Sequence, residues 1–177
     1  MKLHYPLCAS LLALSACSPP PPAPPPAPVV KPAPVVTPAP PPAPRPSANW
    51  LDWPLETGDW VYRRDERGSL ALFGATGQNA TVTLRCDTTR RRLYLARAGA
   101  GPAGRMTVRT SSTLKEFAAS PTGATPAYLA TEILPTDPIL DAMAFSRGRI
   151  ALEVDGQQSI AIPSWTEITR IVEDCRA

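Results

Sequence analysis

Hydrophobic and polar residues alternate in short runs along the middle of this chain, as they do in half-buried β-strands. In the clearest run, Val82, Leu84 and Cys86 alternate with polar residues. The runs cover residues 59–62, 69–73, 80–86, 93–96, 106–110 and 128–134. Polar or glycine-rich turns separate them at intervals of roughly ten residues, so the pattern predicts a mainly β fold, an antiparallel sandwich or a small barrel.

A short helix is predicted where this alternation gives way to helical spacing. Asp137 is a favourable N-cap, and Pro138 suits the first helical position. Gly148 follows soon after the segment and ends it. The apolar residues that share one face of this helix are Ile139, Leu140, Met143 and Ala144.

A second helix is predicted at the C-terminus. Ser164 and Glu167 are three residues apart, as in a capping box, and Pro163 precedes them. An apolar stripe then follows the helical period. Its members are Trp165, Ile168, Ile171 and Val172.

Between the two predicted helices, alternating apolar residues on both sides of Asp155 and Gly156 predict a β-hairpin. A two-residue loop would place Ile160 and Ile162 on the face opposite Ile150, because a shift of one residue turns every side chain over. We therefore expect three loop residues, with Gly156 at a positive φ.

The N-terminus has the layout of a secretory signal peptide. Its apolar run from Leu7 to Leu14 is about half as long as the roughly 20 residues that a membrane-spanning helix needs. The run ends in Leu14-Ser15-Ala16-Cys17, which resembles the lipobox of bacterial lipoproteins. The resemblance implies removal of residues 1–16 and acylation of Cys17, and Ser18 after it favours the outer membrane.

Proline dominates the stretch that follows, since 16 of the 29 residues from 19 to 47 are Pro. Such a run cannot form a packed core and favours the polyproline II conformation. We expect residues 17–18 to form the lipid anchor and residues 19–47 to form a disordered, semi-rigid stalk. A docking site for a domain that reads proline-rich ligands is the alternative, but only Arg45 offers an anchoring side chain.

Residues 48–177 are numerous enough for one domain and too few for two. The whole chain has a formal net charge of +3, and Lys2, Lys31 and Arg45, all outside this domain, account for it. The domain itself is therefore close to neutral. Its charge gives no reason to expect nucleic acid as a partner.

The cysteines predict one disulfide. After cleavage at Cys17 only Cys86 and Cys175 remain unmodified, in an oxidising compartment. Their spacing is unlike the Cys-x-x-Cys of redox sites, so we expect a structural Cys86–Cys175 bond.

Histidine is informative by its absence, because the single one, His4, lies in the signal peptide. The mature chain therefore lacks the base of Ser-His-Asp and Cys-His catalysis and has no imidazole ligand for zinc. Two pairs of carboxylates remain, but a cap and a solvated residue explain the first pair better than catalysis does. The pairs are Asp137 with Asp141, and Glu173 with Asp174.

Three sets of residues remain as candidate binding elements. One is a possible aromatic platform for sugar, for which packing anchors are the preferred interpretation; its members are Trp50, Trp53 and Trp60. The second is a basic strip that could contact phosphates of lipopolysaccharide, for which a solvated turn is preferred; it comprises Arg85, Arg90, Arg91, Arg92 and Arg97. The third is Arg147 and Arg149, which either bind a partner or pair with Asp141 or Glu153.

Three segments resemble a group of envelope proteins of alphaproteobacteria, mainly of the sphingomonad type. They are residues 137–149, Gly58-Asp59-Trp60, and Glu173-Asp174-Cys175-Arg176. The resemblance implies lineage and no activity. We therefore expect a monomeric outer-membrane lipoprotein that faces the periplasm, a binding or structural accessory module without a cofactor or metal, whose partners are the membrane and an unknown envelope protein. Inhibition of an envelope-attacking protease or lysozyme is the alternative, and an enzyme is the weakest hypothesis.

Overall fold

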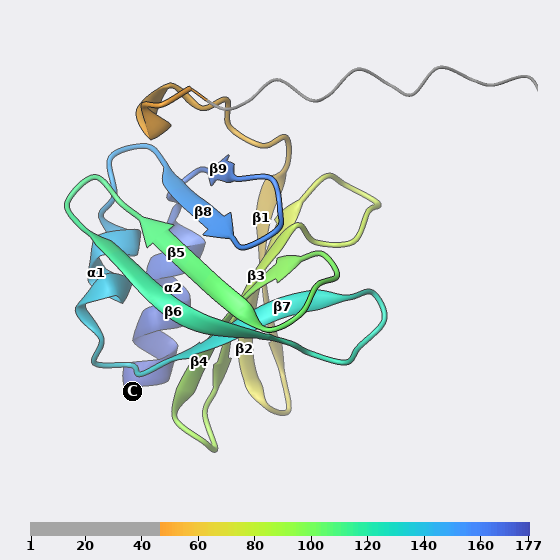
Figure 1. Cartoon of the computed structure of the whole chain (residues 1–177). Coiled ribbons are helices and arrows are strands. Elements are labelled where there is room, and N and C mark those ends of the chain that lie inside the picture. Colours follow the sequence, from red (N-terminus) through yellow and green to blue (C-terminus); the bar gives the residue numbers. More distant parts are fainter. Residues whose placement is uncertain (1–46) are drawn as a thin grey trace, which may run out of the picture. The chain divides into compact units, whose positions relative to one another are not determined.

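The computed structural model describes residues 47–177, which fold around one curled antiparallel sheet, a half-barrel (Figure 1). Its strand order is β1-β2-β3-β4-β7-β6-β5-β8-β9. The strands are β1 (Asp59–Asp65), β2 (Gly68–Gly74), β3 (Val82–Asp87), β4 (Arg92–Ala98), β5 (Gly104–Arg109), β6 (Leu114–Pro121), β7 (Tyr128–Ile133), β8 (Ile150–Val154) and β9 (Ile160–Ile162). The mainly β, antiparallel fold is confirmed. The predicted signal peptide, lipid anchor and nearly all of the stalk lie outside the described residues.

The core lies inside the curl of this sheet, and the alternation in the sequence builds it. Val82, Leu84 and Cys86 are fully buried on one face of β3, whereas the residues between them are partly exposed. Facing strands contribute Met106 and Leu152 to the same core. Burial of such apolar surface is the main favourable term in folding.

Two helices lie side by side against the sheet, α1 (Pro138–Ala144) and α2 (Thr166–Arg176). The predicted cap of α1 is confirmed, because the Ile139 N–H donates to Asp137 Oδ1 at 3.0 Å. Helix α2 packs against β1 to β4, and the buried Ile168, Ile171 and Val172 form its inner face. None of the helices in residues 47–177 is long and apolar enough to cross a membrane.

The capping box predicted for α2 is wrong. Trp165 occupies the N-cap without a side-chain hydrogen bond, and Ser164 Oγ instead donates to the Met143 carbonyl at the end of α1, at 2.6 Å. Trp165 is also 44% exposed, so it does not belong to the buried stripe. The Ser164 hydroxyl therefore bonds to the end of α1 and does not cap α2.

The hairpin of β8 and β9 has the predicted parity, but residues 155–159, five rather than three, lie between its strands. Ile150 pairs with Ile162 and Leu152 with Ile160, which puts all four side chains on the core face. Gly156 has a φ of 76°, which favours glycine at this position.

The segment before β1 is fastened to the outer side of this hairpin. It contains a 3₁₀ turn, η1 (Trp50–Asp52). Trp53 covers Ala151 and Ala161, and the Glu56 N–H donates to the Ala161 carbonyl at 2.8 Å. Trp60 is buried in the main core, where its indole N–H donates to the Pro163 carbonyl. Trp53 and Trp60 are therefore packing anchors, and the aromatic platform is not formed.

A disulfide joins Cys86 in β3 to Cys175 in α2, with a Cα–Cα distance of 5.4 Å. Both cysteines are buried. The bond fastens the last helix to the middle of the sheet, in agreement with the predicted pairing.

Candidate functional site: a groove beside an open strand edge

The sheet splits along β6, a strand that the hydrophobic pattern did not predict. The strand pairs with β5 from Leu114 to Ala119, but with β7 only at Ser120 and Pro121. Figure 1 shows β6 and β7 meeting at one end and diverging toward α1. Most of β6 is therefore paired with a strand on one side only.

The hydrogen bonds of the hairpin show which backbone groups face this open edge. The Thr110 N–H donates to the Thr113 carbonyl at 2.9 Å, and in an antiparallel hairpin the hydrogen-bonded pairs recur at every second residue. The residues whose N–H and C=O groups point away from β5 are thus Leu114, Glu116 and Ala118. All three are exposed. Within residues 47–177 these three make no backbone pairing with β7 or α1.

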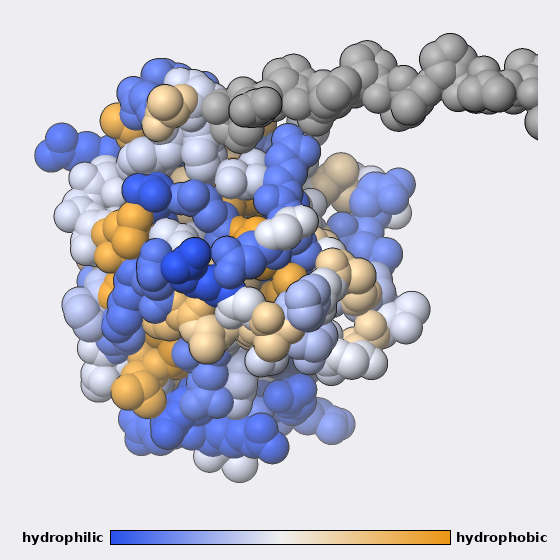
Figure 2. All heavy atoms as spheres, in the orientation of Figure 1, coloured by the Kyte–Doolittle hydropathy of each residue, from blue (hydrophilic) through white to orange (hydrophobic). Residues whose placement is uncertain are grey.

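A cleft of about 490 Å³ lies between the start of β6 and the outer face of α1. Its lining is largely apolar and includes Leu114, Ile139, Ala142 and Phe145. Phe145 is 77% exposed and Leu114 43% exposed. On the face drawn in Figure 2, hydrophobic surface lies in separate patches among hydrophilic side chains. We call this cleft, with the free edge of β6, the α1–β6 groove.

Both walls of the α1–β6 groove are held in place. Buried Ile139, Leu140 and Met143 fix α1 to the core, which leaves Ala142 and Phe145 on the cleft side. The Lys115 ammonium in β6 pairs with the Asp137 carboxylate at the start of α1. The groove is therefore formed before any partner arrives, which lowers the entropy that binding would lose.

Arg147 and Arg149, the two arginines after α1, have different roles in the structure. The Arg147 N–H donates to Ser111 Oγ at 3.0 Å, and the Ser111 N–H donates to the hydroxyl of buried Ser146. This exchange ties the segment after α1 to the β5–β6 turn. Arg147 itself is exposed, and its guanidinium makes no ion pair within the described residues.

Arg149 instead serves the fold. One of its guanidinium nitrogens, Nη1, donates to the Trp53 carbonyl at 2.5 Å, which binds the segment before β1. The partners expected for it are occupied otherwise: Asp141 pairs with Arg176 and Glu153 with Arg109. The expected pairing of Arg147 or Arg149 with these two carboxylates is therefore wrong.

The predicted basic strip does not form one surface. Arg85 makes a bidentate pair with Asp65, and Arg92 pairs with Glu132 at 2.8 Å. Arg97 lies partly buried, and this burial lowers its pKa. Arg90 and Arg91 lie exposed in the turn between β3 and β4, where the preferred interpretation placed a solvated turn, but Arg85, Arg92 and Arg97 do not belong to that turn.

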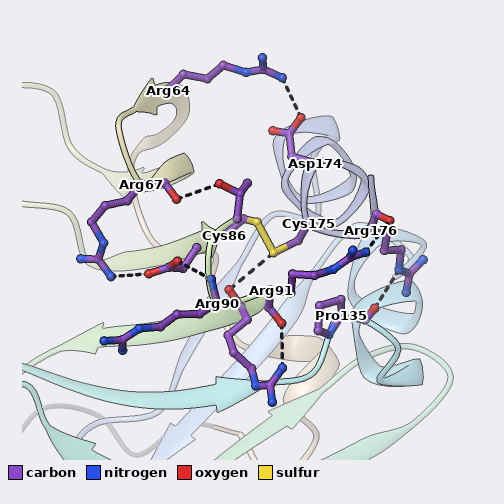
Figure 3. Close-up of a disulfide and its surroundings, with 12 residues drawn as sticks. Arg64, Arg67, Cys86, Arg90, Arg91, Pro135, Asp174, Cys175 and Arg176 are labelled. Atoms are coloured by element: carbon purple, nitrogen blue, oxygen red, sulfur yellow. Dashed lines mark hydrogen bonds and ion pairs between the residues drawn. A yellow bond between two sulfur atoms is a disulfide. The ribbon is translucent and has the colours of Figure 1, made fainter.

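Charged residues around the disulfide also form ion pairs within the domain (Figure 3). Arg67 pairs with buried Asp87 at 3.0 Å, and Arg64 pairs with Asp174 at 2.9 Å. Burial tends to raise the pKa of Asp174, but hydrogen bonds from the Tyr62 hydroxyl and the Arg64 guanidinium outweigh it and hold that pKa below its ordinary value. Asp174 therefore joins α2 to β1 through its contacts with Tyr62 and Arg64.

No cluster of His, Cys, Asp and Glu in residues 47–177 is arranged to hold a metal ion. No protein-family model, curated protein or solved structure matches this chain.

Proposed function

We propose that this chain is a lipid-anchored module of the outer membrane that faces the periplasm and binds an envelope protein through the α1–β6 groove. The observation that carries the proposal is the groove itself. It combines a free strand edge with an exposed phenylalanine, and the exposed Arg147 follows two residues after that phenylalanine.

The anchoring part of the proposal rests on the sequence. The lipobox-like end of the apolar run and the proline-rich stretch after it are those of a tethered periplasmic domain. The disulfide suits the same oxidising compartment. A domain held in this way meets partners at a raised effective concentration, so a modest affinity is sufficient.

The binding part rests on the chemistry of the groove. Apolar side chains that stay exposed in a folded domain are typical of interaction sites, and aromatic residues and arginine are enriched among residues that dominate binding energy. Phe145 and Arg147 provide one of each within three positions. A non-enzymatic role fits the mature chain, which has no histidine.

In-cell photocrosslinking tests the proposal. A photoreactive phenylalanine analogue replaces Phe145, and in a matched control it replaces Thr76, an exposed residue between β2 and β3. We expect a discrete crosslinked protein from position 145 and not from position 76. Equal crosslinking from both positions, or none from position 145, would refute the groove as the binding site.

The identity of the crosslinked protein separates the two functional hypotheses. An assembly or structural protein of the envelope supports the accessory module. A protease or lysozyme as the main adduct supports the inhibitor instead.

A further inference from the structure

We propose that the α1–β6 groove binds its partner by strand addition: an extended segment of the partner pairs with the free edge of β6. This inference rests on the proposed function and specifies its chemistry. It makes backbone hydrogen bonds, rather than side chains alone, the source of recognition.

The free edge has the pattern that an extended chain requires. The outward-facing N–H and C=O groups belong to Leu114, Glu116 and Ala118, and this spacing of two residues is the period of a β-strand. An added strand would place complementary donors and acceptors opposite them, about 4.8 Å away. Three residues offer up to six hydrogen-bonding groups.

The apolar wall of the groove gives the added strand a place for its side chains. In strand addition, main-chain bonds supply affinity while pockets for alternate side chains supply specificity. Ala142 and Phe145 line the cleft beside Leu114, the first residue of the free edge. Small or apolar side chains on one face of the added segment would therefore contact α1.

Two occupants from this chain itself fit the edge poorly. The segment from 19 to 47 is more than half proline, 16 of 29 residues, and proline has no N–H to donate to the β6 carbonyls. A second copy paired through β6 about a twofold axis at Glu116 would set two glutamates opposite each other, which is destabilising. An extended, proline-poor segment of another protein fits best.

The test uses the mature chain in detergent and a ten-residue peptide selected for binding from a random phage-displayed library. Amide hydrogen exchange is measured by NMR, residue by residue, with and without the peptide. We expect the amides of Leu114, Glu116 and Ala118 to slow at least tenfold. The amides of Lys115 and Phe117, which already bond to β5, serve as internal controls and should not change.

Two N-methylated forms of the same peptide provide the matched control. Methyl groups on alternate residues remove the donors from one edge of the peptide or from the other. We expect one form to lose at least tenfold in affinity and the other to bind as before. Equal binding of both forms, unchanged exchange at the three β6 amides, or failure to select any peptide would overturn strand addition.

Failure here is distinguishable from failure of the proposed function. Position 145 could still crosslink a discrete protein while the β6 amides stay unprotected. That result would keep the binding module and reject strand addition.

Discussion

Removal of the disulfide gives the largest change in stability that we expect from this domain. Replacing both Cys86 and Cys175 with alanine opens a covalent loop whose ends are 89 residues apart in sequence. In the chain-entropy description, closing a loop of about this length stabilises the fold by roughly 4–5 kcal/mol. For a domain of this size, that loss corresponds to a fall in Tm of about 15 °C.

The free energy of unfolding is measured by urea denaturation of residues 18–177 produced in an oxidising compartment. The wild-type protein treated with a reductant is the matched control and should unfold close to the double variant. We expect the variant to retain its fold at low temperature, because Ile168, Ile171 and Val172 still pack α2 against the sheet. A loss below about 1 kcal/mol with an unchanged slope in urea would show that the bond does not stabilise the domain through loop closure.

Three further predictions concern the anchor, the arginine pair and acid stability. Cys17→Ala should abolish incorporation of labelled palmitate and leave an uncleaved or soluble protein, which cell fractionation detects. A variant that has the mature size and is found in the outer membrane would contradict the lipobox. Arg149→Lys should lower the free energy of unfolding by about 1–2 kcal/mol, because the hydrogen bond to the Trp53 carbonyl is lost. Arg147→Lys should leave Tm unchanged but weaken crosslinking from position 145. Equal shifts in Tm for the two variants would contradict this division of roles. The pKa of Asp174 lies below its ordinary value, so its stabilising effect is complete above about pH 4 and is lost as pH falls through the folded-state pKa. The free energy of unfolding, measured by urea titration at a series of pH values, should therefore fall less steeply in acid for Asp174→Asn than for the wild type. An equally steep fall in both proteins would contradict this role of Asp174.

Local signals made much of the fold predictable from sequence. The strand alternation at Val82, Leu84 and Cys86, the Asp137 cap and the parity of the β8–β9 hairpin each depend on neighbouring residues, and the structure has all three. The disulfide followed from counting cysteines.

The unpredicted features depend on contacts between distant parts of the chain. The position of Ser164 before α2 suits a helix cap, but its hydroxyl donates to the Met143 carbonyl 21 residues earlier. Arg149 reaches the Trp53 carbonyl 96 residues away, which no spacing rule reveals. Periodicity also missed β6, because Leu114 and Phe117 are three residues apart, as in a helix. The polar residues 110–113 between two apolar segments were the available sign of a hairpin there.

The position of the disulfide also determines what a single proteolytic cut does to this protein. Residues 122–127, between β6 and β7, are all exposed, and they lie inside the loop closed by Cys86 and Cys175. A cut there leaves two fragments that the disulfide still joins covalently. Residues 75–79, between β2 and β3, are also exposed but lie outside that loop. A cut there severs the covalent path from the N-terminus to the α1–β6 groove, so the two fragments come apart once β1 and β2 separate from the sheet.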